Sequence, residues 1–184
     1  MGQVARVTRL LDEYLVTAAM AGDEKAFGQL VGRWNRRLVA HAWRLTGDRE
    51  MALDAVQSGW ADIVRGLGHL QDARAFPAWA YRIVSRACSR QVGQGIRRRE
   101  LAQALGSQPE TSSPMPDVGC EGSALQAAIR ALPSEQRAAI ALFHFEEMSV
   151  AEVAVALDVP AGTVKTRLMH GRRKLREALE GADQ

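Results

Sequence analysis

The stretch SVAEVAVALDVPAGTVKTRL, residues 149–168, decides the fold of the C-terminal part of the chain. Ser149 and Glu152 have the spacing of a capping box, which predicts that a helix begins here. Apolar residues at helical spacing follow, namely Val150, Val153, Ala154 and Leu157. Asp158 is expected at the bend, because Asp adopts the left-handed backbone conformation more readily than most other residues. A second amphipathic helix comes next, so the stretch predicts a helix-turn-helix.

The second helix carries a local excess of positive charge. Between Pro160 and Glu180 the sequence has six Lys and Arg against two Glu, which leaves an excess of four. The second helix of a helix-turn-helix enters the major groove, where cations hold phosphates and residues near the helix start contact base edges. The polar face expected to contact DNA consists of Thr163, Lys165, Thr166, Arg167, His170, Arg172 and Arg173. The alternative is an ordinary helical hairpin with a solvated basic face.

A second basic run, RIVSRACSRQVGQGIRRR at residues 82–99, has six Arg and no acidic residue. Of the two aromatic residues before it, Trp79 lies on the apolar stripe and is expected in the core. Tyr81 lies off that stripe and is the better candidate for stacking on bases. Gly93 and Gly95 favour an early end of this helix, since each costs about 1 kcal/mol relative to Ala in a helix interior. The alternative for the arginines is a solvated helix face.

The N-terminal part of the chain has the pattern of a helical bundle. Apolar stripes at helical spacing run through residues 27–45, 52–67 and 76–87, and a shorter helix is expected at about 12–20. Asp23 and Asp48 stand where helix caps are expected, and Gly47 stands where a helix should end. No segment has the alternation of a β-strand, so the fold expected is all-α.

Composition changes abruptly between these two helical parts. Residues 106–122, GSQPETSSPMPDVGCEG, contain three of the six prolines and little that could be buried. We interpret them as a flexible linker between an N-terminal bundle at residues 1–105 and a C-terminal helix-turn-helix domain at residues 123–184. The alternative is an ordered surface loop, which is uncommon at this length.

The overall composition excludes several classes of protein. The chain has 184 residues, 47% of them hydrophobic and 24% charged, with a formal net charge of +3, which is ordinary for a soluble domain. Two cysteines, Cys88 and Cys120, are too few for a disulfide framework or a structural zinc site, and a redox role for either is unmotivated. No apolar run approaches the ~20 residues of a membrane span, and the N-terminus has no secretory segment. We therefore expect a cytoplasmic protein.

No arrangement of residues points to catalysis. The four His are scattered without a partner at metal-ligand spacing, so no metal, no cofactor and no enzymatic activity are expected. Glu146 and Glu147 form an adjacent carboxylate pair. Neighbouring residues at a helix end point apart, so these two are expected in a solvated turn.

Residues 131–179, ALPSEQRAAIALFHFEEMSVAEVAVALDVPAGTVKTRLMHGRRKLREAL, closely resemble the fourth conserved region of bacterial sigma factors. The run PAGTVKTRL followed by RRKLRE is typical of the extracytoplasmic-function group. DEYLVTAAMAGDEKAFGQLVGRW, LTGDREMALDAVQSGW and FPAWAYRIV are similar to the second region of that group. Region two, a linker and region four make up the minimal layout of the group.

The resemblance implies a partner and two DNA sites. Such proteins bind core RNA polymerase, and the segment that docks on the β′ clamp helices matches Asp54, Ala55, Val56 and Gln57. The segment after Phe76 recognises and melts the −10 element, and the residues implied here are Tyr81, Arg82, Arg86, Arg90, Arg97 and Arg98. The helix matching residues 163–173 reads the −35 element of promoter DNA, and region four also contacts the β flap. An anti-sigma factor is a further expected partner.

The sequence departs from the family pattern at four positions. Ser58 stands where an acidic residue is usual, and Leu53 where Glu is frequent, so the presumed docking face loses negative charge. Arg86 and Arg90 stand where the family commonly has Asn and Asp, which predicts unusual −10 specificity. The alternative function is a helix-turn-helix regulator that never joins polymerase, although such a protein has no reason to carry the clamp-docking segment.

Overall fold

The computed structural model describes residues 2–104 and 124–180, and in this part every regular element is helical. The N-terminal bundle consists of α1 (Gly2–Met20), α2 (Glu24–Thr46), α3 (Arg49–Gly66) and α4 (Phe76–Ala104), with short 3₁₀ turns η1 (Leu67–His69) and η2 (Ala73–Ala75) between α3 and α4. The C-terminal domain consists of α5 (Ala124–Ala131), α6 (Ser134–Ile140), the π-helical turn η3 (Ala141–Phe145), α7 (Val150–Leu157) and α8 (Ala161–Glu180). The predicted all-α fold is confirmed. The expected linker lies outside the described residues.

Aromatic side chains from α2 and α4 fill the centre of the N-terminal bundle. Trp34, Phe76 and Tyr81 are all at least 98% buried, and the rings of Trp34 and Phe76 meet edge to face at 5.2 Å. Local signals set the helix ends around this core. The Asp23 carboxylate accepts hydrogen bonds from the backbone N–H groups of Lys25 and Ala26, and the predicted cap at Asp48 is confirmed on α3.

Two helices of the bundle are longer than predicted. Helix α1 begins at Gly2 rather than near residue 12, and no Gly or Pro interrupts its sequence after that glycine. The expected early end of α4 was wrong, because α4 continues through Gly93 and Gly95 to Ala104. Gly95 lies against the Met51 side chain of α3. A cost of about 1 kcal/mol for each glycine is therefore too small to end a helix that packs on its neighbour.

The helix-turn-helix of the C-terminal domain has the predicted local geometry. Ser149 and Glu152 form both hydrogen bonds of a capping box, and Asp158 ends α7 in the left-handed conformation, with φ 57° and ψ 47°. Helix α8 packs closely on α6, where a Cβ on Gly171 would lie 3.0 Å from a side-chain carbon of Ile140. The glycine therefore permits the close approach of the two helices.

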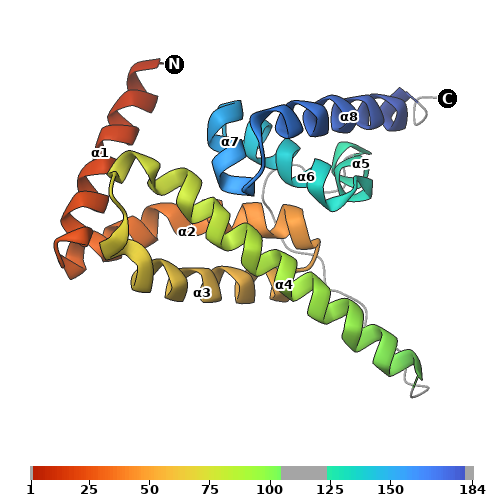
Figure 1. The fold of residues 1–184 in the computed structure, drawn as a ribbon, viewed down its shortest axis with the longest axis horizontal. Helices are drawn as coiled ribbons and strands as arrows, with labels where there is room; N and C mark the ends of the chain where they lie inside the picture. The colour runs from red at the N-terminus through yellow and green to blue at the C-terminus, as the bar shows by residue number, and fades with distance from the viewer. Residues whose placement is uncertain (1, 105–123, 181–184) are drawn as a thin grey trace.

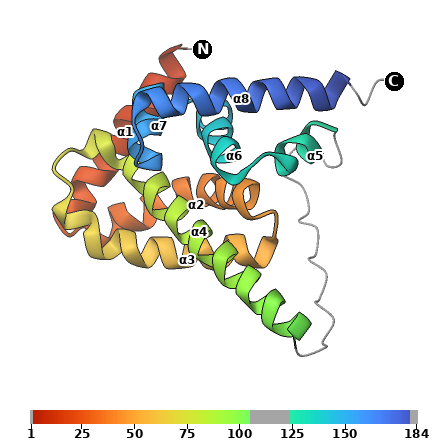
Figure 2. The ribbon, with the colours of Figure 1, turned by 45° about the vertical axis from the view of Figure 1, so that its right-hand side comes forward.

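The two domains lie against each other. Helix α7 packs beside α4, and α6 contacts α2 (Figures 1 and 2). The C-terminal end of α4 projects away from the rest of the molecule (Figure 1). No helix in the described ranges is both long and apolar enough to cross a membrane.

Candidate nucleic-acid interface

Helix α8 presents a basic surface to solvent. Lys165, Arg172 and Arg173 are exposed and line one shallow hollow, together with Met169 and Arg176. The floor of this hollow is apolar and includes Phe143, Val150 and Leu168. Cationic side chains around an open hollow on the second helix of a helix-turn-helix have the arrangement needed to hold DNA phosphates.

Two contacts hold Arg172 in place at the edge of this hollow. Its guanidinium carbon lies 5.2 Å from the ring centre of Phe143, and its Nε donates to Nε2 of His144 at 3.2 Å. Burial, and then the charge of Arg172, lower the pKa of His144. A lowered pKa favours the neutral ring, which can accept this hydrogen bond.

The structure does not bring all seven predicted residues of α8 to one face. Thr166 is exposed, whereas Thr163 and His170 are half-buried. The Arg167 side chain is only 18% exposed and forms an ion pair with Glu135 of α6 at 2.8 Å. Arg167 therefore lies toward the domain interior rather than in the hollow of Lys165 and Arg172.

Sequence reasoning missed two members of the α8 surface. Met169 is 59% exposed, and Arg176 extends the basic hollow toward the C-terminus. Met169 follows Lys165 by four residues and precedes Arg172 by three, so helical spacing alone could have placed it on this face. An exposed apolar side chain among cations can contact the methyl group of a thymine.

The prediction for Tyr81 was wrong, whereas Trp79 packs against the core as expected. Tyr81 is fully buried, its ring centre 5.9 Å from that of Trp34 and 5.0 Å from that of His41, whereas Trp79 is only partly buried. Helix α4 contacts α2, α3 and α7, so its buried arc is wider than the apolar stripe in the sequence. Tyr81 is a core residue here and offers no surface on which a base could stack.

Three of the four α4 arginines whose side chains the structure describes form ion pairs. Arg82 and Arg86 each lie 2.8 Å from the Asp158 carboxylate of the C-terminal domain. Arg90 lies 3.5 Å from Asp62 of α3. Arg97 is exposed, and the side chain of Arg98 lies outside the described residues.

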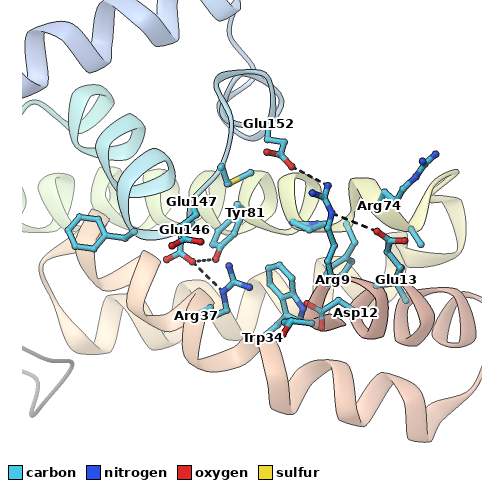
Figure 3. A pocket seen from close by; sticks show the side chains of 17 residues that line it. Arg9, Asp12, Glu13, Trp34, Arg37, Arg74, Tyr81, Glu146, Glu147 and Glu152 are labelled. Atoms are coloured by element: carbon cyan, nitrogen blue, oxygen red, sulfur yellow. Dashed lines mark hydrogen bonds and ion pairs between the residues drawn. The ribbon is translucent and has the colours of Figure 1, made fainter. Parts of the chain in front are cut away.

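A buried carboxylate at the domain boundary was not predicted. Glu146 is 8% exposed and accepts a hydrogen bond from the Tyr81 hydroxyl (Figure 3). Its other partners are Arg37 at 3.4 Å and Arg44 at 2.9 Å, both on α2. Burial, and then the negative charge of Glu146, raise the pKa of Tyr81, so the phenol keeps its proton and remains a donor. The expected solvated turn is wrong for Glu146, whereas Glu147 is exposed as expected.

A cavity of about 520 Å³ lies beside this carboxylate, between the two domains. Its labelled lining residues come from α1, α2, η2, α4 and the segment around α7 (Figure 3). Arg9 of α1 reaches across this space to Glu152 of α7 at 3.5 Å. The cavity is therefore bordered by ion pairs that join the domains.

The predicted polymerase-docking segment on α3 divides into two faces. Asp54 and Gln57 are exposed, whereas Ala55 and Val56 are at least 98% buried in the bundle core. The side chains of Ala55 and Val56 therefore cannot contact a partner, because successive helical residues point in different directions. Leu53, at 41% exposure, lies on the open side with Asp54.

Cys88 lies in the core as a free thiol. Cys88 is 1% exposed, and burial raises the pKa of its thiol to about 12, which disfavours the reactive thiolate. Cys120 lies outside the described residues. Within residues 2–104 and 124–180, no three His, Cys, Asp or Glu side chains gather in a way that could hold a metal ion.

Comparison with known proteins gives two domain matches and several full-length relatives. The family model described as "Sigma-70 region 2" matches residues 30–99, and that described as "Sigma-70, region 4" matches residues 123–175. The chain is 34% identical over 172 residues to the ECF RNA polymerase sigma factor SigM of Mycobacterium tuberculosis, covering 91% of this chain and 84% of SigM. It is 30% identical over 179 residues to the ECF RNA polymerase sigma-E factor of Escherichia coli, with 91% and 93% covered.

Solved structures agree with this fold. The sigma factor RpoE of Bartonella quintana, crystallised with the anti-sigma factor NepR, superposes with a TM-score of 0.72 at 24% identity, over 85% of this chain and 98% of RpoE. CnrH, in complex with the cytosolic domain of CnrY, gives a TM-score of 0.69 at 26% identity, over 95% and 99%. Two helical domains of this kind are thus shared along almost the whole chain.

Proposed function

The chain belongs to the extracytoplasmic-function group of RNA polymerase sigma factors, and we propose that three separate surfaces bind the −35 element, core polymerase and the −10 element. It is an alternative sigma factor that directs transcription initiation. The proposal also includes the residues of each surface. It divides the chain into an N-terminal domain at residues 1–105, a linker at 106–122 and a C-terminal domain at residues 123–184. The polymerase performs the chemistry, so the chain itself acts as a binding subunit in the cytoplasm.

The −35 element is assigned to α8. The observation that carries the proposal is the open basic hollow of Lys165, Arg172 and Arg173 on the second helix of a helix-turn-helix. Such a helix fits the major groove, and its cations can neutralise phosphates on either side. Met169 joins the base-contacting set, whereas Arg167 supports α8 through Glu135.

Core polymerase is assigned to α3. Asp54 and Gln57 are exposed side by side along this helix, with Leu53 beside them. We place the β′ clamp contact on these three side chains, and a β flap contact on the C-terminal domain. The −10 element is assigned to the arginines of α4, with Arg86 and Arg90 as the positions that set an unusual specificity.

An anti-sigma factor is proposed as a regulatory partner. CnrH, which this chain resembles in sequence and fold, was solved in complex with the cytosolic domain of another protein, CnrY. The apolar and charged surfaces used for polymerase would be hidden by such a partner. Recovery of the chain from cell extract with polymerase alone, and never with a second small protein, would remove this part of the proposal.

The first test is binding to core RNA polymerase without DNA, measured by size-exclusion chromatography. The wild-type chain should co-elute with the polymerase, and Asp54→Ala should weaken this binding by about tenfold or more, as expected when one partner of an interfacial charge pair is truncated. Alanine favours the helix, so α3 should remain intact. Glu24→Ala, which removes an exposed acid from α2, is the matched control and should bind normally.

Two outcomes would contradict the proposal. A wild-type chain that binds duplex DNA but never polymerase would favour a stand-alone regulator. Equal losses in Asp54→Ala and Glu24→Ala would move the polymerase contact away from this part of α3.

A further inference from the structure

The ion pairs between the two domains all have the same polarity. In each pair among the described residues, an arginine of the N-terminal bundle meets a carboxylate of the C-terminal domain. The arginines are Arg9, Arg37, Arg44, Arg82 and Arg86, and the carboxylates are Glu146, Glu152 and Asp158. In these ion pairs the C-terminal domain therefore supplies the anions, and the phosphates of a nucleic acid would supply anions to the same arginines.

Glu146 is built into this contact. The residue is 8% exposed, and its side-chain partners in the described part are Arg37, Arg44 and Tyr81, all across the boundary. A charge this deeply buried is stable only where partners compensate it. Among the described residues, every hydrogen bond and ion pair of the Glu146 side chain goes to the bundle, so the bundle compensates its charge.

The arginine site that receives Glu146 is organised by aromatic rings. Arg37 and Arg44 lie two turns apart on one face of α2. The Arg37 guanidinium lies 4.6 Å from the ring centre of Trp34, and the Tyr81 hydroxyl adds a neutral donor. Two arginine forks with a hydroxyl form a site for an oxyanion, and carboxylate and phosphate share this chemistry.

Asp158 makes a second contact of the same kind. Its carboxylate lies 2.8 Å from both Arg82 and Arg86, two of the arginines assigned to the −10 element. Asp158 also has φ 57°, and the other described non-glycine residue with positive φ is Glu147, next to Glu146. Both carboxylate contacts are thus made at the tight bends that flank α7.

We propose that Glu146 and Asp158 hold the free chain in a closed form by occupying two arginine sites of the bundle, Arg37 with Arg44 and Arg82 with Arg86, that bind backbone phosphates of single-stranded promoter DNA once the domains separate. This inference rests on the proposed function of α4. It adds Arg37 and Arg44 of α2 to the DNA-binding residues.

The Asp158 contact is suited to reversal. Asp158 is 56% exposed, and its two arginines are 33% and 56% exposed, so this pair is weak and screened by salt. The boundary is charged rather than purely apolar, as is common where domains of one chain move relative to each other. A strand of DNA brings many phosphates at once, and it can therefore displace two carboxylates.

The test compares variants that remove opposite sides of the same ion pairs, in the full-length chain. E146Q/D158N removes the two carboxylates with little change in shape, and Asn tolerates the left-handed conformation at position 158. R37Q/R44Q removes one arginine site. E147Q is the matched control, since Glu147 is an exposed neighbour with no ion pair to a described residue. Circular dichroism first establishes that each variant keeps its helical content.

Two measurements follow, namely the radius of gyration by small-angle X-ray scattering and the affinity for a fluorescein-labelled single-stranded DNA of mixed sequence by anisotropy. E146Q/D158N should expand the chain and strengthen DNA binding by about tenfold, the gain expected if about one molecule in ten is open beforehand. R37Q/R44Q should also expand the chain, but it should bind DNA more weakly than E146Q/D158N. E147Q should resemble the wild type in both measurements.

Each contrary result overturns part of the inference. Unchanged scattering in E146Q/D158N would show that the carboxylates do not hold the domains together. Expansion without stronger DNA binding would show that they do not compete with phosphate. Polymerase co-elution of the wild-type chain reports the proposed function separately, so that function can stand while the closed form fails.

Discussion

The two basic faces of the molecule differ in what their side chains are free to do. On α8, Lys165, Arg172 and Arg173 are exposed and line an open hollow. On α4, Tyr81 is in the core and Arg82 and Arg86 are paired with the other domain. Two segments that both carry positive charge in the sequence therefore differ in how freely their cations can bind DNA. Substitutions of these three α8 side chains should change DNA binding alone, whereas those on α4 should also change stability and domain contact.

The sharpest test of this comparison is Tyr81→Ala. Removing a buried aromatic ring leaves a cavity and should lower the free energy of unfolding by about 3–5 kcal/mol. Urea unfolding followed by tryptophan fluorescence reports this directly, because all four tryptophans lie between residues 34 and 79, in the bundle.

The chain supplies a matched control for that experiment. Tyr14 is the other tyrosine and is 68% exposed on α1, so Tyr14→Ala should change stability by no more than about 0.5 kcal/mol. Similar small losses in both variants would mean that Tyr81 is accessible, and would restore it as a platform for bases.

A smaller effect is the pH dependence that His41 gives to the free energy of unfolding of the bundle. Burial, and then the charge of Arg44, lower the pKa of His41 from 6.5 to about 3. The unfolded chain takes up a proton at this histidine below pH 6.5 while the folded chain does not. Stability is therefore fully present above pH 6.5 and falls by about 1.4 kcal/mol for each pH unit toward pH 3.

His41→Gln should remove this dependence. Gln can replace the hydrogen bond between Nε2 of His41 and the Ser85 hydroxyl, which is 2.9 Å long. Tryptophan-monitored urea unfolding at neutral and mildly acidic pH measures the difference. An equal pH response in wild type and His41→Gln would refute this role of burial.

The local features of the fold could be predicted from sequence because they depend on neighbouring residues. The capping box at Ser149, the left-handed Asp158 and the cap at Asp48 each follow from a few adjacent side chains. Tyr81 and Glu146 could not be placed in this way. Tyr81 packs on Trp34 and His41 of α2 and donates a hydrogen bond to Glu146, which is 65 positions away in the sequence. Helical periodicity carries no information about contacts between elements so far apart in the chain.

The residues of α8 also differ in how well the sequence predicts their positions. Lys165 and Arg172 were predicted correctly as exposed residues of α8, because spacing along one helix fixes which side chains share a face. Arg167 was placed with them, but its partner Glu135 lies on α6. An ion pair between helices is invisible to a pattern read along one helix.

The smallest effect expected is that of Lys165→Ala on α8. Its ammonium is exposed and has no described ion pair, so the free energy of unfolding should change by no more than about 0.5 kcal/mol. Loss of one phosphate contact should reduce the slope of log affinity against log salt by about 0.9 for duplex DNA, measured by anisotropy. Lys25→Ala removes the same charge from an exposed position on α2, in the other domain, and should leave the slope unchanged. A loss of stability in Lys165→Ala as large as that in Tyr81→Ala would contradict the difference between the two faces. The Lys165 side chain would then contribute as much to the packing of the fold as the buried ring of Tyr81.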